Sequence, residues 1–222
     1  MDWTAVGLSL RLALLTVLIL VPVGLLVARW LAWTRFRARP LLEALFALPL
    51  VLPPTVLGFY LLVAMGAHSP LARWVESWTG HTLAFSFSGI LVASLIANLP
   101  FAIQPMQRAF EGIAPEVREA AAVSGLSRWR SFWRIELPLA WPGVLSAMVL
   151  TFAHTLGEFG VVLMVGGSIP GETRTAAIAI YDRVQAFDEA GAGRMAALLL
   201  AISMVAISAS YLVSARVGRR RG

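Results

Sequence analysis

Residues 119–138, EAAAVSGLSRWRSFWRIELP, form a charged and aromatic island inside a chain that is otherwise strongly apolar. Glu-Ala-Ala is followed after three residues by Gly125, and after nine more by Ile-x-Leu-Pro, which ends at Pro138. Alanines favour a helix of little bulk, Gly125 tolerates the left-handed conformation that ends a helix, and Pro115 suits a first helical turn. The pattern predicts a helix, a glycine elbow and a second helix that Leu137 and Pro138 stop.

The composition around this island is that of a membrane protein. Hydrophobic residues make up 59% of the 222 residues, charged residues make up 14%, and the mean hydropathy is +0.78. A soluble domain of this size cannot bury so much apolar surface. The net charge of +6 comes from 18 arginines without any lysine. Because the arginines flank apolar stretches, we interpret them as topology-setting residues and expect no nucleic-acid partner.

Five stretches are apolar and long enough to cross the lipid bilayer as helices, which takes about 20 residues each. They are residues 6–28, 44–65, 83–105, 139–165 and 195–215. The sequence therefore predicts an all-α integral membrane protein in which residues 1–222 form a single transmembrane domain. Residues 175–187 are too short to span, and we expect an interfacial or re-entrant helix there.

Arginine sets the orientation of these spans, because cytoplasmic loops carry an excess of positive residues. Thirteen arginines flank the spans on the side of the island, and four lie on the opposite side. The island and the C-terminus are therefore predicted to be cytoplasmic and the N-terminus outside. The thirteen are Arg29, Arg35, Arg37, Arg39, Arg108, Arg118, Arg128, Arg130, Arg134, Arg216, Arg219, Arg220 and Arg221.

Three prolines, Pro49, Pro53 and Pro54, interrupt the second predicted span. Each proline removes a backbone donor and clashes with the preceding helical turn, so the helix must kink. The freed carbonyls then need cover from neighbouring helices or water. The pattern leaves open whether this is a merely bent helix or a flexible helix that lines a pore.

The spacing of the island resembles the EAA loop of the membrane subunits of ATP-binding-cassette importers. It matches at Glu119, Ala120, Ala121, Gly125, Ile135, Leu137 and Pro138. The resemblance implies a type I importer permease fold, a bacterial inner-membrane location, and docking of residues 115–138 on two cytoplasmic ATPase subunits. The residues alone leave a second interpretation open, an arginine-rich loop lying on anionic lipid headgroups.

The resemblance also implies roles for individual residues of the loop. Contact with the ATPase, or shaping of that contact, would fall to Glu119, Ala120, Ala121 and Gly125. Bracing of the elbow against the spans would fall to Trp129, Phe132 and Trp133.

No ATPase site is expected in this chain, because a P-loop needs a lysine and the chain has none. ATP and magnesium would be bound by the partner ATPase, and this chain would carry no cofactor and be no enzyme. The sequence contains no H-E-x-x-H or G-x-S-x-G motif, which argues against an intramembrane enzyme. It also shows no internal repeat, which argues against a self-contained secondary transporter or channel.

Two further stretches resemble the oxyanion branch of these importers, and most of all its molybdate permeases. They are LPLVLPPTVLGFYLL at residues 48–62 and LGEFGVVLMVGGSIPGETRTAAIAIY at residues 156–181. The resemblance implies molybdate import by a homodimer and an external molybdate-binding protein, for which we expect docking on Pro170, Gly171, Glu172 and Arg174. Sulfate, thiosulfate and tungstate remain alternative substrates.

Two charged residues, Glu158 and Arg11, lie inside predicted spans, where an unpaired charge is costly. Together with Pro53, Pro54 and His154 they are our candidates for gate or pore residues. We expect Glu158 to pair with Arg11 or to form a hydrogen bond near His154. Alternatively, Arg11 snorkels to the surface and Glu158 faces a water-filled cavity. His154 and Glu158 alone offer too few ligands, so no metal site is predicted.

Overall fold

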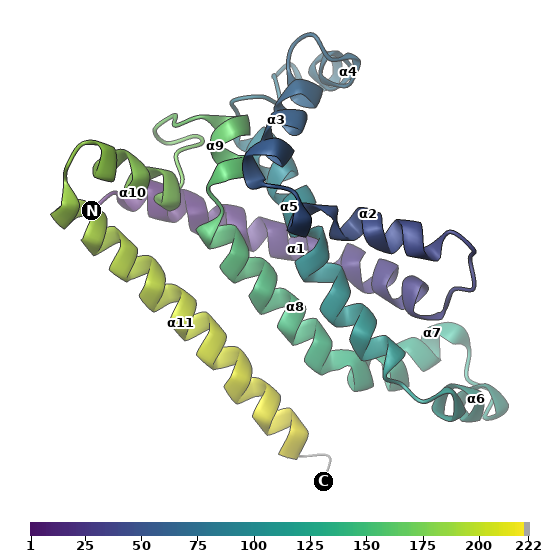
Figure 1. The fold of residues 1–222 in the computed structure, drawn as a ribbon. Helices are drawn as coiled ribbons and strands as arrows, with labels where there is room; N and C mark the ends of the chain where they lie inside the picture. Colours follow the sequence, from purple (N-terminus) through teal and green to yellow (C-terminus); the bar gives the residue numbers. More distant parts are fainter. Residues whose placement is uncertain (220–222) are drawn as a thin grey trace.

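Every regular element of the described chain, residues 1–219 of the computed structural model, is a helix (Figure 1). This confirms the predicted all-α class. The elements are α1 (Trp3–Trp33), α2 (Arg39–Val51), α3 (Pro54–Met65), α4 (Pro70–Thr79), α5 (Phe87–Glu111), α6 (Pro115–Val123), α7 (Arg128–Ser131), a π-helical turn (Phe132–Glu136), α8 (Leu137–Gly157), α9 (Gly160–Gly166), α10 (Ala176–Gln185) and α11 (Glu189–Arg219).

Four helices among the described residues are long and apolar enough to cross a membrane. They are α1, α5, the helix that runs through α7 into α8, and α11. The bent pair of α2 and α3 makes a fifth crossing if it counts as one span. The predicted stretch 83–105 begins and ends a few residues early, because Ser86 caps α5 by accepting a hydrogen bond from the Gly89 amide and the helix continues to Glu111.

The core of the domain lies where α1, α5 and α8 pack together. Leu31 of α1 and Met106 and Phe110 of α5 are fully buried there. The backbones approach closely at Gly143 of α8, where an added Cβ would lie 2.4 Å from the Cβ of Ala109. Small residues at such contacts let membrane helices pack by close van der Waals contact. These three helices therefore form the frame that positions the remaining elements.

The prediction of one kinked helix over residues 44–65 is wrong. The chain is extended at Leu52 and Pro53, and it bends by 110° between α2 and α3. The residue before a proline is disfavoured in the helical region, and Pro53 and Pro54 impose this restriction on two successive residues. The helix therefore breaks, and Pro54 starts a new helix at its first position.

The predicted span 139–165 is also wrong at both ends. The helix does not stop at Leu137 and Pro138, since α7 continues through the π-helical turn into α8. The Leu137 amide bonds the Phe132 carbonyl, five residues back, and this wider turn carries the chain past a proline that lacks an N–H. At the other end, α8 stops at Gly157, and the extended Glu158 separates it from α9.

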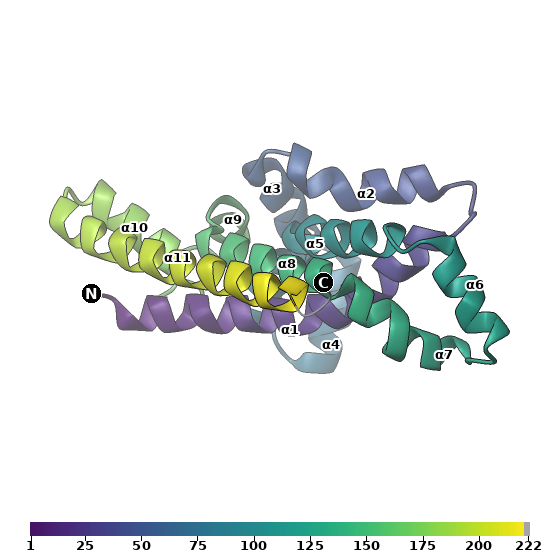
Figure 2. The same cartoon turned by 90° about the horizontal axis from the view of Figure 1, so that it is seen from below.

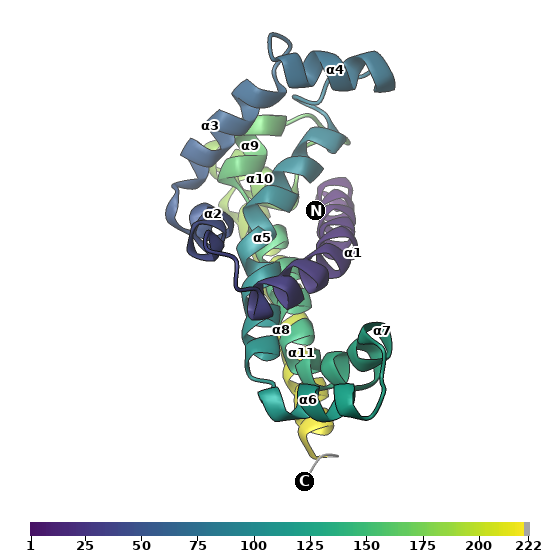
Figure 3. The same cartoon turned by 90° about the vertical axis from the view of Figure 1, so that its right-hand side faces the viewer.

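The two ends of α1 contact different loops. At its start, Asp2 caps the helix and forms an ion pair with Arg174 of the 167–175 loop. Arg174 Nη2 lies 2.9 Å from Asp2 Oδ2. Near its other end, Arg29 binds Glu136 of residues 115–138, the predicted coupling loop. The elements α6 and α7 project at the end of the bundle away from the N-terminus (Figures 2 and 3). Arg220 and Arg221 lie outside the described residues.

The contact between Arg29 and Glu136 anchors the coupling loop to α1. Glu136 is 3% exposed, and its carboxylate accepts hydrogen bonds from Arg29 Nε at 2.6 Å and Nη2 at 3.3 Å, and from the Ser131 hydroxyl at 3.2 Å. A bidentate pair of this kind combines charge with fixed geometry. It holds the π-helical turn against the end of the first helix.

Glu136→Ala should destabilise the protein, because it leaves the Arg29 guanidinium without its acceptor. Breaking a buried pair costs about 3–5 kcal/mol, and we expect the lower end because Arg29 retains 30% exposure. Thermal unfolding in detergent should show a fall in Tm of roughly 5–10 °C. Glu116→Ala, at an exposed acid of α6, is the control and should leave Tm unchanged. Replacing both partners with leucine should recover part of the loss, and no recovery would contradict the ion-pair explanation.

Candidate functional site

The loop from Pro115 to Pro138 has the predicted helix, elbow and second helix. At the end of α6, Gly125 adopts a φ of +74°, and the Leu126 amide bonds the Ala121 carbonyl at 3.2 Å. This left-handed turn closes the helix and reverses the chain. Ser127 then caps α7 by accepting a hydrogen bond from the Arg130 amide.

The two faces of α6 differ in exposure. Glu119, Ala120 and Val123 are exposed, and Val123 retains 89% of its side-chain exposure. Ala121 is 4% exposed and packs inward, so the structure gives it a place in the interior of the loop. An apolar side chain as exposed as Val123, next to a residue as small as Ala120, leaves this face open to close contact with another protein.

The aromatic residues of the loop do not all pack against the spans as predicted. Phe132 is 2% exposed and belongs to the core between α1, α5 and α8. Trp129 and Trp133 lie edge-on to Phe132, with ring centroids 5.8 and 5.0 Å away, but remain 64% and 59% exposed. Of these three aromatic residues, Phe132 alone packs into the core, and the two tryptophans present their rings at the surface.

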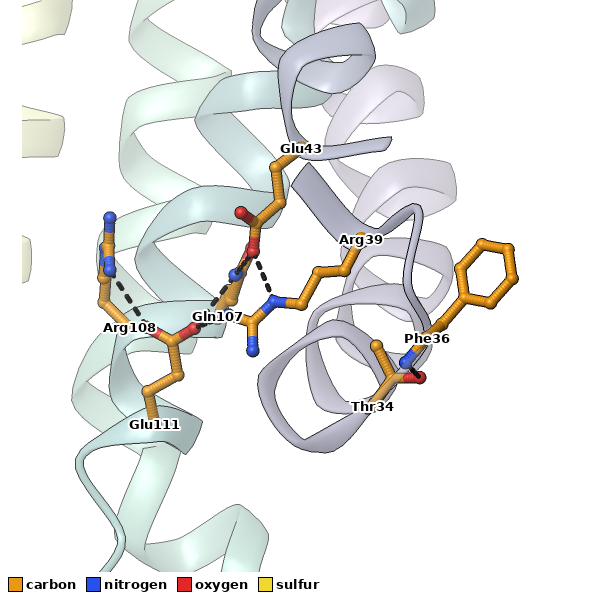
Figure 4. Close-up of polar contacts among 7 residues, drawn as sticks. All are labelled: Thr34, Phe36, Arg39, Glu43, Gln107, Arg108 and Glu111. Atoms are coloured by element: carbon orange, nitrogen blue, oxygen red, sulfur yellow. Dashed lines mark hydrogen bonds and ion pairs between the residues drawn. The ribbon is translucent and has the colours of Figure 1, made fainter. Parts of the chain in front are cut away.

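A polar cluster that we did not predict joins α2 to α5 (Figure 4). Gln107 donates from Nε2 to Glu43 Oε1 at 2.6 Å and to Glu111 Oε1 at 3.0 Å. Arg39 binds both of these glutamates, and Arg108 donates to Glu111. The four-residue spacings of Arg39 with Glu43 and of Gln107 with Glu111 were visible in the sequence. Their meeting across two helices was not.

The two broken segments meet at glycines. An added Cβ on Gly160 of α9 would lie 2.8 Å from the Cβ of Pro54, and one on Gly58 of α3 would lie 2.7 Å from the Cβ of Met164. The stretches LPLVLPPTVLG and LGEFG, far apart in the sequence, are therefore in contact. Only glycine permits this approach, and the candidate gate residues Pro53 and Pro54 lie beside the segment that follows Glu158.

A chain of polar side chains crosses the interior between α1, α5 and α8. The Thr16 hydroxyl donates to Ser94 Oγ at 3.2 Å, and Asn98 Nδ2 donates to the Ser94 carbonyl at 2.8 Å. Asn98 Oδ1 lies 3.1 Å from His154 Nδ1, whose ring stacks on Phe101 with centroids 4.1 Å apart. The candidate His154 is thus held on both sides. The sequence showed Asn98 only as a polar residue within an apolar stretch.

The Glu158 carboxylate lies at the end of this chain. It is 7% exposed, and its Oε2 is 3.3 Å from His154 Nδ1. The Nδ1 hydrogen bond goes to Asn98, so Oε2 has no hydrogen-bond partner among the described residues. No group of three or more histidine, aspartate or glutamate side chains in residues 1–219 is arranged to hold a metal ion.

The predicted pairing of Glu158 with Arg11 is wrong. The Arg11 side chain is exposed, and its Cζ lies 4.4 Å from the centre of the Phe87 ring. The ring face attracts the guanidinium, so the charge lies along the surface of the bundle. Of the expected alternatives for Glu158, the structure supports a position beside His154.

Of the four expected docking residues in the 167–175 loop, three are exposed and one forms an ion pair with another part of the protein. Pro170, Gly171 and Glu172 are exposed, while Arg174 is engaged with Asp2. The loop is held from within by the fully buried Thr173, whose hydroxyl donates to the Gly166 carbonyl at 2.7 Å. Three of the four expected docking residues therefore lie at the surface of the loop, next to the exposed Ser168 and Ile169.

Comparison with known families identifies this arrangement. Residues 20–221 match the family described as binding-protein-dependent transport system inner membrane component. The chain belongs to this family. It is therefore a multi-pass inner-membrane permease of an ATP-binding-cassette importer, and the ATPase is a separate subunit. The predicted family and location are confirmed.

Several curated members of the family are similar over most of their length. The molybdenum transport system permease protein ModB of Azotobacter vinelandii is 47% identical over 95% of this chain and 93% of its own length. The protein of that name from Escherichia coli K12 is 38% identical over 99% and 96%. The sulfate transport system permease protein CysT of the same strain is 34% identical over 89% of this chain and 71% of its own length.

Solved structures agree on the fold of the permease. A bacterial transporter that imports the acidic polysaccharide alginate matches with a TM-score of 0.76, covering 96% of this chain and 78% of that one. The sequence identity is 17%, so the likeness concerns the fold. It confirms the predicted importer permease fold.

Gly125→Val should disturb the elbow without creating a clash. An added Cβ at this position meets nothing within 4 Å, so the cost lies in the positive φ, about 1–3 kcal/mol for a residue other than glycine. We expect a several-fold loss of transport-coupled ATP hydrolysis in the reconstituted importer. Gly125→Asn should be milder, because asparagine tolerates this conformation. Gly193→Ala, in open space on α11, is the control and should behave as wild type. Equal effects of Val and Asn would contradict the backbone explanation.

Proposed function

We propose that this chain is the permease of a molybdate importer, in which it works as a homodimer with two ATPase subunits and a molybdate-binding protein. The observation that carries the proposal is the 47% identity with a molybdenum permease over almost the full length of both chains. Sulfate is the second candidate substrate, because a sulfate permease is 34% identical over 89% of this chain. Tungstate would follow the molybdate route, since the two dianions are nearly equal in size.

In the proposed arrangement the broken pair α2–α3 counts as the second of five spans, in a type I permease. The N-terminus and the 167–175 loop then face outward, and the coupling loop faces the cytoplasm. The contact between Asp2 and Arg174 supports this, because it places the N-terminus and the outer loop at one end of the domain. The excess of arginine around the coupling loop supports its cytoplasmic position.

The exposed face of α6, with Glu119, Ala120 and Val123, is the proposed contact with the ATPase. Movement of the ATPase subunits would displace α6 and turn the permease pair alternately toward each side. A continuous helix joins this loop to the interior, because α7, the π-helical turn and α8 are uninterrupted from Arg128 to Gly157. Displacement at the loop would therefore reach His154 and the break at Glu158.

The proposed gate is the region where the two broken helices meet. Pro53 and Pro54 lie on one segment, and Glu158 lies at the break that precedes the other. Helix ends carry free backbone amides and carbonyls that tolerate membrane depth only where protein or water covers them. The exposed Pro170, Gly171 and Glu172 are the proposed docking surface for the binding protein.

Uptake by the complete importer tests the substrate. Proteoliposomes that contain this permease, its ATPase and its binding protein should accumulate molybdate only with ATP, and tungstate should compete. A hundredfold excess of sulfate should leave molybdate uptake unchanged. Preferential sulfate uptake would overturn the molybdate proposal and leave the family assignment intact.

Val123→Asp tests the proposed ATPase contact, because it buries a charge in an apolar interface if the contact exists. We expect the permease to lose co-purification with the ATPase and ATP-driven uptake to fall at least tenfold, while the Tm of the isolated permease stays unchanged. Val184→Asp is the matched control, since Val184 is 53% exposed on α10 near the opposite end of the domain. Normal ATPase binding by Val123→Asp would contradict the contact.

A further inference from the structure

A partly enclosed cavity of about 520 Å³ lies between the end of α1 and the coupling loop. Arg29, Trp30 and Trp33 line it from α1, and Arg118, Arg128 and Ser131 line it from the loop. Its location is distinct from the proposed gate and from the exposed face of α6. The mechanism proposed above assigns it no role.

The cavity carries an excess of positive charge. Three arginines line it, and Glu136 is the acid in its wall. That carboxylate is already bound by Arg29 and Ser131. Neither Arg118 nor Arg128 forms an ion pair within the described part of the chain. Two guanidinium groups therefore face one cavity without a counter-charge from this chain.

Arg118 is positioned for a ligand rather than for solvent. Its Cζ lies 3.8 Å from the centre of the Trp33 ring, so the guanidinium lies over the face of the indole. Its Nε is buried and has no hydrogen-bond partner among the described residues. A stacked guanidinium keeps its in-plane N–H donors available, and these match the oxygens of a phosphate group.

The depth of the cavity points to the membrane surface. Trp30 and Trp33 lie at the end of a spanning helix, where indole rings prefer the interface between hydrocarbon and water. Basic pockets between membrane helices on the cytoplasmic side suit the headgroups of anionic lipids. The cavity also lies on a different face of α6 from the proposed ATPase contact. Arg118 and Ala122, four residues apart, line the cavity, whereas Ala120 and Val123 do not.

We propose that this cavity binds a phosphate group through Arg118 and Arg128, either the headgroup phosphate of an anionic phospholipid or a free phosphate ion. The bound group would bridge α6 and α7 and steady the coupling loop against α1. This inference uses the cytoplasmic position of the loop but does not depend on molybdate as the substrate.

The test compares the full-length permease with its Arg118→Gln/Arg128→Gln double variant. Native mass spectrometry and thermal unfolding in detergent would follow titrations of phosphatidylglycerol, phosphatidylcholine and inorganic phosphate. Arg130→Gln is the matched control, because Arg130 is exposed on the same short helix and does not line the cavity. We expect wild type and the control to bind phosphatidylglycerol more tightly than phosphatidylcholine. The double variant should bind at least tenfold more weakly, at about 1 kcal/mol for each arginine near the surface.

Stabilisation by inorganic phosphate that the double variant loses, without a preference for phosphatidylglycerol, would support the site with a free ion as its ligand. Equal binding of all ligands by wild type and double variant would overturn the proposal. So would an equal loss in Arg130→Gln, which would indicate general surface charge. Loss of ATPase binding in the double variant, with lipid and phosphate binding unchanged, would also overturn it in favour of a protein contact. None of these binding measurements depends on uptake, so their failure is distinct from failure of the molybdate proposal.

Discussion

The structure depends on the need of every backbone amide and carbonyl in an apolar surrounding to find a partner within the protein. Continuous helices satisfy this need, so each interruption must be covered. The chain interrupts its helices at Leu52 and Pro53 and again at Glu158. It packs the segments that follow, α3 and α9, against each other through Gly58 and Gly160. Each broken segment thereby covers the other, and the proposed gate forms where continuous helix is absent.

At the coupling loop, in contrast, the helix is uninterrupted. The π-helical turn at Phe132–Glu136 carries the chain past Pro138, so that α7 and α8 form one continuous helix. Phe132 and the pair of Arg29 with Glu136 fix this helix to α1, and Gly125 lets α6 fold back beside it. In the proposed mechanism, a displacement of α6 would be transmitted along this continuous helix. The cationic cavity lies at the joint between these parts.

Charge and neutral polarity are separated along the bundle. The interior carries Thr16, Ser94 and Asn98, which satisfy one another through hydrogen bonds. Glu158 is the acidic group at the end of this chain. The fully paired clusters, such as Glu43 with Arg39 and Gln107, lie toward the coupling-loop end. Apart from Glu158, this arrangement keeps charged side chains out of the apolar layer, where their burial is costly.

The sequence by itself determined the membrane class, the approximate positions of the long apolar helices and the helix–elbow–helix of residues 115–138, and its arginines predict the sidedness of the loops. These are local properties, because hydropathy, arginine distribution and the conformational freedom of Gly125 act over a few residues. The tertiary structure decided which side chains meet. Arg11 turned to Phe87 instead of Glu158, and Trp129 and Trp133 stayed at the surface while Phe132 alone entered the core. Whether a proline breaks a helix was likewise decided by context, since Pro53 and Pro54 ended one and Pro138 did not. Such outcomes depend on the partners that packing supplies, and those partners lie far away in the chain.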